Sequence, residues 1–358
     1  MRINVLSLFD GISCGQIALE RAGLEVDNYF ASEIDKFALQ VAKHNYPNTK
    51  HLGDVMQVKG SELPKINLLI GGSPCQGFSF AGKQLNFKDP RSKLFFEFVR
   101  LLKETKPKYF LLENVKMKKE YQDVITQHLG VKPIEINSAL VSAQDRKRLY
   151  WTNIPNVTQP EDKKLMLKHI VEPEINKKDF DITERMKKKK PGTLAYEKAW
   201  KNVRSLNEKS KTLLTVQSIS NSGATNIKYS DNKYYKPTPI EAERLQTLPD
   251  NYTEGISNSQ RYKCLGNGWT VDVIAHILSF IPETHLHTVV GLFDGISCGQ
   301  VALKRAGKIY NQYYASEIDE YAIWVTQKNF PHTIQLGDVT KIDWDAFLDR
   351  LNLIQNVS

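Results

Sequence analysis

The chain has 358 residues, a mass of 40.9 kDa and a formal net charge of +9, with 41% hydrophobic and 25% charged residues. This composition excludes a disulfide-stabilised miniprotein, and no stretch approaches the ~18 consecutive apolar residues of a membrane span. The first residues run directly into a glycine turn and lack the features of a secretory signal, so we expect a cytoplasmic protein.

Four cysteines occur in the sequence, at Cys14, Cys75, Cys264 and Cys298. They form no CxxC pair and no cluster with histidines at the spacing of metal ligands. We therefore expect neither a disulfide framework nor a metal site.

Apolar runs alternate with helical patterns along the first 150 residues. Strands are predicted at residues 4–8, 29–32, 66–70 and 109–112, and helices at residues 16–22, 37–44 and 94–102. Parallel strands joined by helices form an open, doubly wound sheet that binds ligands beyond the carboxyl ends of its strands. The predicted fold class is therefore α/β with a mostly parallel sheet, and residues directly after each strand become candidates for a site.

The pattern changes between Pro155 and Pro237, where short polar pieces replace the regular elements. This region contains 18 Lys and Arg against 10 Asp and Glu, which is nearly all of the positive excess of the chain. A run such as residues 187–190 is often only a solvated face, but a basic region also suits a nucleic-acid partner. Helical patterns return at residues 239–245 and 271–280.

An internal repeat relates the two ends of the chain at a spacing of 284 residues. Val289 to Val339 copies Val5 to Val55, and 30 of the 51 aligned positions are identical. The similarity is too long for convergence, so the chain carries a second copy of its first β-α-β-α segment. The copy ends before the counterpart of residues 71–115, so it contains only half of a nucleotide-binding sheet.

The first predicted strand leads into Phe9-Asp10-Gly11-Ile12-Ser13-Cys14-Gly15, which opens a helix. Glycines here let the backbone approach a ligand. The segment lacks the complete GxGxxG and GxxxxGK(S/T) motifs of phosphate-binding loops, so a turn that serves only the packing of the fold stays an alternative. Glu33 follows the second strand, where doubly wound folds place an acid against ribose hydroxyls. Asp54 follows a third strand and either accepts from an adenine amino group or caps a turn.

The most specific segment is Gly71-Gly72-Ser73-Pro74-Cys75-Gln76-Gly77-Phe78-Ser79. A Pro-Cys step between a buried strand and a glycine turn favours a nucleophilic thiol over a small buried cysteine. Glu113 follows the next strand and would lie beside this thiol, as acid and nucleophile acting on one substrate require. Arg146 and Arg148 would share one face of an extended segment.

In this order the segments FDGISCG, ASEID, GDV, GGSPCQGFS, ENV, QDRKR, ERLQTLPDNY and LGNGWTV resemble the signature motifs of the S-adenosylmethionine-dependent DNA (cytosine-5) methyltransferases, over residues 1 to about 281. FDGI, LFFEFVRLL and LGNGWTV look more like the animal de novo branch than like bacterial restriction-modification enzymes. The sequence departs modestly from the motifs of the family in two places. Ser13-Cys14 precedes Gly15, where many members of the family have another glycine, and Lys147 separates Arg146 from Arg148.

The resemblance implies transfer of a methyl group from S-adenosylmethionine to C5 of a cytosine flipped out of double-stranded DNA, with S-adenosylhomocysteine and 5-methylcytosine as products. The Cys75 thiolate would add to C6 and so make C5 nucleophilic. Glu113 would hold or protonate N3, and Arg146 and Arg148 would stabilise the charge.

Two further sets of residues follow from the resemblance. The cofactor would contact Phe9, Asp10, Gly11, Ile12, Gly15, Glu33, Ile34, Asp54, Val55, Ser73, Pro74, Asn267, Trp269 and Val271. The DNA would contact Gln76, Ser79, Lys187, Lys188, Arg204, Thr215, Gln217, Ser222, Gly223 and Arg244.

The resemblance also divides the chain into parts. Residues 1–154 form the catalytic and cofactor-binding domain, residues 155–238 the target-recognition region, and residues 239–284 the return to the catalytic domain. Residues 285–358 form a non-catalytic partial repeat. Half a sheet exposes a strand edge and an apolar face, which favours docking of this repeat. It would pack on the first domain, or mediate a homodimer or pseudo-dimer, or take the place of the first copy in the sheet. Alternatively, it is a partly disordered remnant.

Three alternatives remain open at this stage. A tRNA cytosine methyltransferase of the same fold lacks support because its characteristic Cys-Phe-Thr tripeptide is absent. A catalytically silent homologue would be expected to lose Cys75 or Glu113, and both are present. A dinucleotide-dependent dehydrogenase leaves the Pro-Cys step unexplained. Phage self-protection, restriction-modification and an orphan enzyme are equally open as biological roles, in a prokaryotic or phage-infected cell.

Overall fold

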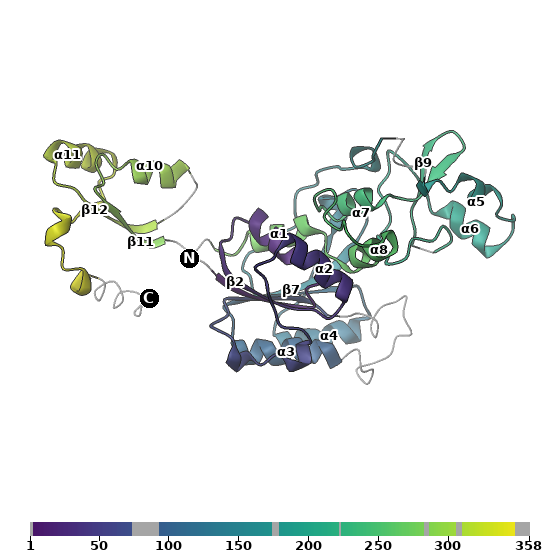
Figure 1. Cartoon of the computed structure of the whole chain (residues 1–358), viewed down its shortest axis with the longest axis horizontal. Coiled ribbons are helices and arrows are strands. Elements are labelled where there is room, and N and C mark those ends of the chain that lie inside the picture. The colour runs from purple at the N-terminus through teal and green to yellow at the C-terminus, as the bar shows by residue number, and fades with distance from the viewer. Residues whose placement is uncertain are drawn as a thin grey trace. The chain divides into compact units, whose positions relative to one another are not determined.

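The computed structural model describes residues 3–73, 93–173, 179–221, 223–282, 286–305 and 310–347. The chain divides into two compact units, one that ends at Ile281 and one that begins at Pro282 (Figure 1). Within the described residues the first unit contains a seven-stranded and a three-stranded sheet, and the second unit contains a three-stranded sheet.

The seven-stranded sheet has the order β3-β2-β1-β4-β5-β7-β6. Its strands are β1 Ile3–Leu8, β2 Val26–Ser32, β3 Lys50–His51, β4 Leu68–Gly72, β5 Tyr109–Val115, β6 Ile134–Asn137 and β7 Lys147–Thr152. The first five strands pair in parallel, and β7 runs antiparallel to both β5 and β6. This arrangement confirms the predicted α/β fold with a mostly parallel, doubly wound sheet.

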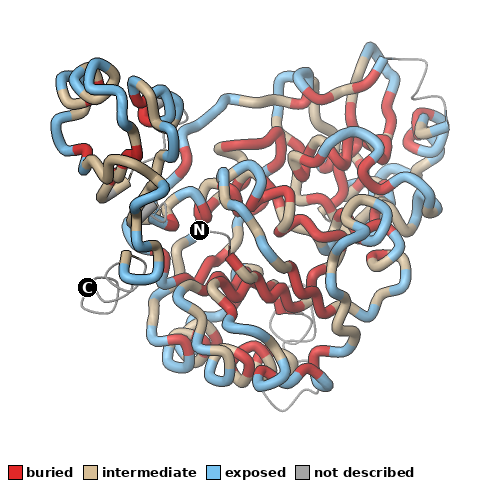
Figure 2. The backbone as a smooth tube through the Cα atoms, turned by 60° about the vertical axis from the view of Figure 1, so that its left-hand side comes forward, coloured by how far each residue is buried: buried red, intermediate tan, exposed pale blue. Residues whose placement is uncertain are grey.

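Helices cover both faces of this sheet (Figure 1). One face carries α1 Cys14–Arg21, α2 Lys36–Asn45 and α9 Val271–Leu278, and the other carries α3 Lys93–Thr105 and α4 Lys119–Leu129. Because successive side chains of a strand point to opposite faces, Val5 packs in the cluster with α1 while Leu6 and Leu8 pack in the cluster with α3. The interior strands are therefore buried along most of their length (Figure 2).

Short 3-10 turns follow several strands and direct the chain over the sheet. They are η1 Val55–Gln57, η2 Gly60–Glu62 and η3 Ser138–Leu140. The helices that follow β2 and β3 begin on aspartates: the Asp35 carboxylate accepts from the N–H groups of Phe37 and Ala38, and the Asp54 carboxylate accepts from the N–H of Met56. These caps fix the chain where it leaves the carboxyl ends of the strands.

Residues 155–238 contain small elements rather than further βαβ units. They are η4 Leu167–His169, α5 Thr183–Lys187, α6 Leu194–Lys201, β8 Val203–Ser205, β9 Asn226–Ser230 and β10 Lys233–Tyr235. The strands form a sheet of order β10-β9-β8. A separate hydrophobic cluster of Ile182, Met186, Ala199, Ile219 and Tyr234 holds the two helices against it.

The chain then returns to the large sheet through α7 Pro239–Leu245 and α8 Asn258–Asn267. A capping box starts α7, because Thr238 accepts from the N–H of Glu241 and the Glu241 carboxylate accepts from the N–H of Thr238. Pro239 occupies the first turn, where its missing N–H costs no hydrogen bond.

The second unit repeats the start of the first. It contains β11 Leu286–Leu292, α10 Cys298–Arg305, β12 Tyr310–Ser316, α11 Glu320–Asn329, β13 Ile334–Gln335 and η6 Val339–Lys341. The strands pair in parallel in the order β11-β12-β13, which matches β1-β2-β3. Within the described residues, β11 has no counterpart of the β4 strand that pairs with β1.

Candidate functional site

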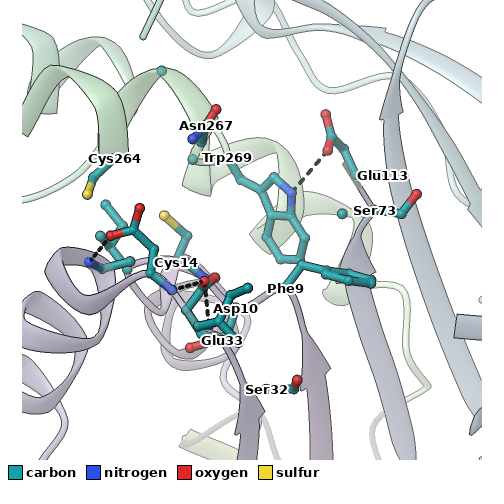
Figure 3. Close-up of a pocket in the computed structure, with 18 of the residues that line it drawn as sticks. Phe9, Asp10, Cys14, Ser32, Glu33, Ser73, Glu113, Cys264, Asn267 and Trp269 are labelled. Carbon is teal, nitrogen blue, oxygen red and sulfur yellow. Dashed lines mark hydrogen bonds between the residues drawn. The ribbon is translucent and has the colours of Figure 1, made fainter. Parts of the chain in front are cut away.

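A cavity of about 340 Å³ lies at the carboxyl ends of β1, β2, β4 and β5, as the doubly wound topology requires (Figure 3). Its lining combines aromatic, acidic and basic side chains from segments far apart in the sequence. The lining residues predicted from the sequence are Phe9, Asp10, Gly11, Ile12, Glu33, Ile34, Asp54, Val55, Ser73, Glu113, Arg146, Arg148, Asn267 and Trp269.

The Glu33 carboxylate is held in one orientation by three backbone N–H groups. Gly11 donates to Oε2 over 2.8 Å, and Ile34 and Asp35 each donate to Oε1 over 2.8 Å. Gly11 has a φ of +59°, a conformation that favours glycine, and this geometry lets its N–H reach Glu33. A fixed acid beside an open backbone turn suits a ligand with adjacent hydroxyl groups.

Asp10 lines the cavity, and its side chain is buried. Its carboxylate accepts hydrogen bonds from the Ser13 hydroxyl and, over 2.7 Å, from the Tyr29 hydroxyl. Burial raises the pKa of Asp10, and the hydrogen bonds oppose that shift only in part. Asp10 therefore supports the turn below the cavity, a role that the sequence did not reveal.

Glu113 and Arg148 form a largely buried ion pair at the far end of the cavity. The Arg148 Nε lies 3.0 Å from Glu113 Oε1, and the side chains of Arg148 and Glu113 are 13% and 12% exposed, respectively. On the other oxygen, the Trp269 indole N–H donates to Glu113 Oε2 over 3.2 Å (Figure 3). The cavity thus places an oriented carboxylate and a guanidinium within one site.

Arg146 lies differently from Arg148 although both line the cavity. Its side chain is buried and donates to the backbone carbonyls of Leu213, Gly266 and Gly268 at 3.2, 3.1 and 3.0 Å. This guanidinium therefore joins the segment before β7 to the loop at Leu213 and to the C-terminal end of α8. These hydrogen bonds hold distant segments together. The sequence predicted only that Arg146 and Arg148 share one face of an extended segment, so it could not reveal them.

The rim of the cavity contains two thiols and an ion pair. Burial raises the pKa of Cys14 and of Cys264 to about 12, so both stay protonated near neutral pH. The Lys263 ammonium lies 2.5 Å from Asp35; burial opposes ionisation of Asp35, but the hydrogen bond from Lys263 holds its pKa below the usual range.

Some predicted cofactor residues lie outside the lining. Gly15 lies in α1 with no room for a side chain, since a Cβ would be 2.6 Å from Ile70 Cδ1, and Val271 is buried in the core at the start of α9. Pro74, Cys75, Gln76, Ser79 and Ser222 lie outside the described residues.

The predicted DNA-contacting residues are spread over the first unit. Lys187 pairs with Glu184 at 3.0 Å, and Arg244 pairs with Asp250 at 2.6 Å. Lys188, Arg204, Thr215, Gln217 and Gly223 lie in residues 183–223, where the Gln217 amide donates to the carbonyl of Leu214 over 2.8 Å. None of these seven residues lines the cavity.

Several lining residues were not predicted from the sequence, among them Ser32, Gly72, Asn114, Lys263 and Cys264. Asn114 had a signal, because it follows Glu113 at the end of a predicted strand. Its amide donates to the Ser73 hydroxyl over 3.1 Å and so fixes the chain after β4. Lys263 and Cys264 lie on a helix whose contact with this edge depends on the return of the chain to the sheet.

The described residues contain no candidate membrane span and no candidate metal cluster. No helix among them is long and apolar enough to cross a membrane. No group of three or more His, Cys, Asp or Glu side chains among them is placed to hold a metal ion.

The fold and the cavity define a class: doubly wound α/β proteins that bind a nucleoside-bearing cofactor beyond the ends of their strands. The chain belongs to the C-5 cytosine-specific DNA methylase family, whose model matches residues 3–283 and 287–355. It is a DNA (cytosine-5-)-methyltransferase, and its cofactor is S-adenosylmethionine.

The relatives come from bacteria and phages. A type II methyltransferase of Lactococcus lactis subsp. cremoris is 31% identical, over 79% of this chain and 78% of its own length. A type II methyltransferase of Neisseria lactamica is 30% identical, over 76% of this chain and 94% of its own. An orphan methyltransferase of Bacillus phage rho11s is 44% identical, but only over 32% of this chain and 23% of its own.

Solved structures share the fold. An Entamoeba histolytica methyltransferase has a TM-score of 0.66 at 20% identity, covering 78% of this chain and 98% of that one. A DNMT2 mutant of Spodoptera frugiperda has a TM-score of 0.62 at 21% identity, covering 78% and 100%. Identities this low support the fold alone.

The expected likeness to the animal de novo branch was wrong. The relatives that show the family are bacterial type II and phage methyltransferases. The segments behind that expectation are short: FDGI lies in the turn after β1, LFFEFVRLL in α3, and LGNGWTV between the end of α8 and the start of α9. Such segments constrain packing and cofactor contact in any branch of the fold, so they do not discriminate between branches.

The residues of the cavity fit S-adenosylmethionine. The cavity volume of about 340 Å³ lies within the ~300–1,000 Å³ of small-molecule sites. The fixed Glu33 carboxylate suits ribose hydroxyls, the Asp54 carboxylate suits an adenine amino group, and Phe9 offers an aromatic ring.

We predict that Glu33→Gln weakens S-adenosylmethionine binding about 10-fold or more, because the neutral amide replaces a charged acceptor held by three N–H groups. Isothermal titration calorimetry of the full chain measures the change. The repeat provides a matched control: Glu317 accepts from Gly295 over 2.8 Å just as Glu33 accepts from Gly11, so Glu317→Gln should leave the affinity unchanged. Equal loss in both variants would contradict the assignment to Glu33.

Proposed function

We propose that the chain methylates C5 of a cytosine flipped out of double-stranded DNA, with Cys75 as the nucleophile and Glu113, Arg146 and Arg148 acting on the base. The observation that supports this proposal is the cavity, in which the fixed Glu33 carboxylate and the Glu113–Arg148 pair lie at the ends of strands of one sheet. The cofactor and the base would meet there.

Cys75 is the cysteine best suited to the reaction. Cys14 and Cys264 also lie at the cavity, but burial raises the pKa of each to about 12, and a protonated thiol is a poor nucleophile. Cys298 belongs to the second unit. Cys75 follows the last residue of β4 by three positions, in a Gly-Ser-Pro-Cys segment.

The proposed reaction passes through a covalent bond between Cys75 and the base. The Cys75 thiolate forms a bond to C6 of cytosine, and the electron pair moves to C5, which takes the methyl group. When bound, S-adenosylmethionine supplies that methyl group from a sulfonium centre. A base then removes the C5 proton, the bond from C6 to sulfur breaks, and the thiolate leaves. Glu113 holds or protonates N3 and so stabilises the charge that addition sends into the ring.

The two arginines contribute in different ways in this proposal. Arg148 pairs with Glu113 at 3.0 Å and lies beside the base site. Arg146 is buried against backbone carbonyls, and its charge adds to the positive potential at the cavity that favours a thiolate. We expect loss of Arg146 to affect folding of the loops as well as catalysis.

We assign DNA recognition to residues 155–238, between a catalytic domain of residues 1–154 and its return over residues 239–284. Positive charge is concentrated there, and contacts to phosphates offset the cost of flipping a cytosine out of the duplex. Thr215, Gln217, Ser222 and Gly223 are proposed to read bases, and Lys187, Lys188, Arg204 and Arg244 to contact the backbone. Gln76 and Ser79, next to the nucleophile, would contact the DNA around the flipped base.

The bacterial and phage relatives support a role in the cytoplasm of a bacterial or phage-infected cell. The type II relatives favour the modification enzyme of a restriction-modification pair, and the orphan relative favours phage self-protection. Both roles use the same methylated product.

The non-catalytic repeat of residues 285–358 is proposed to mediate a homodimer or pseudo-dimer. Residues that are buried in the first copy are exposed in the second: Ile12 is 1% exposed but Ile296 is 52%, and Leu8 is 0% but Leu292 is 49%. Exposed apolar side chains of this kind favour association.

We expect Cys75→Ser to bind DNA and cofactor nearly as the wild type does but to lose methyl transfer, since a serine alkoxide is not available at neutral pH. Transfer of tritiated methyl groups to DNA measures the loss. Duplex DNA with 5-fluorocytosine at the target should trap the wild type covalently and leave Cys75→Ser untrapped. Substantial residual transfer by the variant would remove Cys75 from the mechanism.

Neutral replacement of the four lysines at residues 187–190 should weaken DNA binding and flatten its salt dependence, by up to ~0.9 log units for each phosphate that the variant no longer neutralises. Fluorescence anisotropy over a series of salt concentrations gives the slope. An unchanged slope would show that these lysines are only a solvated face.

Deletion of residues 285–358 should convert the protein to a monomer without abolishing methyl transfer, because the cavity belongs to the first unit. Light scattering after size exclusion measures the mass of the full chain and of the deletion variant. A monomeric full chain would refute the dimer, and loss of methyl transfer on deletion would show that the first unit depends on the repeat.

A further inference from the structure

Trp269 lies between the cofactor side of the cavity and Glu113 (Figure 3). Its indole N–H donates to Glu113 Oε2 over 3.2 Å, while Arg148 Nε lies 3.0 Å from Oε1. One carboxylate oxygen therefore accepts a hydrogen bond and the other lies in an ion pair, and the two partners come from different elements of the fold. A partner at each oxygen sets both the position and the rotation of the carboxylate.

Gly72 leaves the space that this hydrogen bond needs. It pairs with Glu113 in the register of β4 and β5, and a Cβ on Gly72 would lie 2.9 Å from Trp269 Nε1 and 3.0 Å from Glu113 Oε2. A side chain at this position would push the donor and the acceptor apart. The contact between Trp269 and Glu113 thus depends on a glycine on a third segment.

The turn that carries Trp269 is anchored from behind. The carbonyl of Gly268 accepts from Arg146 Nη2 at 3.0 Å and from the Gln246 amide at 3.1 Å. The carbonyl of Gly266 accepts from the same guanidinium at 3.1 Å. Because buried hydrogen bonds hold the neighbouring residues, the indole approaches Glu113 from a fixed backbone.

We infer that Trp269 is a positioning residue for Glu113, an inference that rests on the proposed role of Glu113 at the target base. A carboxylate offers about four lone-pair sites on its two oxygens. Trp269 and Arg148 face one site on each oxygen, so another site on each remains for the hydrogen-bonding edge of cytosine. One oxygen would accept from the N4 amino group. The other would bond to N3 through the proton that Glu113 donates there, because N3 of neutral cytosine is itself an acceptor. The indole thereby holds the Glu113 carboxylate in a rotation in which both of its oxygens face the base.

Within the part of the chain that the structure describes, the charged and titratable groups beside Glu113 come from the strand paired with β5. They are Arg148 and Tyr150 of β7 and Arg146 immediately before it. Burial raises the pKa of Tyr150, so its phenol stays neutral. Trp269 adds a neutral N–H donor to these groups. Loss of this donor should therefore displace the pH profile of kcat to higher pH, which a change in stability alone would not do.

The experiment compares Trp269→Phe with the wild type in the full chain. Phenylalanine keeps an aromatic ring in the cavity but removes the N–H. We expect kcat to fall about 10-fold or more, as for loss of a hydrogen bond to a charged group. We expect KM for S-adenosylmethionine to change less than about threefold, since uniform binding is retained. The transition in the pH profile of kcat should move upward by about half a unit or more.

Trp151→Phe is the matched control. The Trp151 indole N–H donates to the Thr126 hydroxyl over 3.0 Å within the core on the α4 side of the sheet, so this variant loses one indole hydrogen bond away from Glu113. It should lower the melting temperature and leave the pH transition in place. A second variant, Gly72→Ala, retains Trp269 but separates its N–H from Glu113. It should shift the pH profile of kcat in the same direction as Trp269→Phe does. If Trp269→Phe does not fold, Gly72→Ala alone tests the positioning role.

Glu113→Gln separates this inference from the proposed function. If Glu113→Gln is inactive and both Trp269→Phe and Gly72→Ala keep the wild-type transition, the positioning role is overturned while the role of Glu113 stands. If Glu113→Gln keeps its activity, the proposed role of Glu113 fails, and the inference about Trp269 fails with it.

Discussion

The parallel register of four neighbouring strands is the constraint on which the site depends. Leu8 of β1 lies opposite Ser32 of β2 and Gly71 of β4, and Gly72 lies opposite Glu113 of β5. The residues that follow these strands must therefore emerge at one edge of the sheet. A slip of one residue would turn the side chains of a strand to the opposite face and separate the acids from the cavity.

The repeat separates what local sequence can build from what the whole domain must supply. Gly295 donates to Glu317 over 2.8 Å, the same length as the bond from Gly11 to Glu33, so the turn and its acid need only their own segment. In the repeat, three backbone N–H groups also lower the pKa of Glu317. Burial of the apolar face is different, because it requires the segments that follow Val55 in the first copy.

Much of the fold could be predicted from the sequence because the buried strands and helices have clear periodicities. The predicted strand at residues 109–112 lies within β5, and the predicted helix at residues 94–102 lies within α3. Local signals also placed Glu33 and Glu113 after strands, and both line the cavity.

The rest depended on contacts between distant segments. Alternation along β7 could not reveal that Arg146 bonds to the carbonyls of Gly266 and Gly268, about 120 residues further on. Asp10 was expected at the cofactor, but its carboxylate accepts from Tyr29 within the protein. The small sheet of residues 203–235 escaped prediction because its strands are short and its core is formed by a few side chains such as Met186 and Tyr234.

The proposed function requires the cavity at the strand ends to bring the cofactor and a target cytosine together. Bisulfite sequencing of DNA from a bacterial host that expresses the full chain tests this requirement. We expect 5-methylcytosine at one recurring short sequence, and none in the same host expressing Cys75→Ser. Unmethylated cytosines throughout, from a folded chain that binds S-adenosylmethionine, would contradict the proposed function.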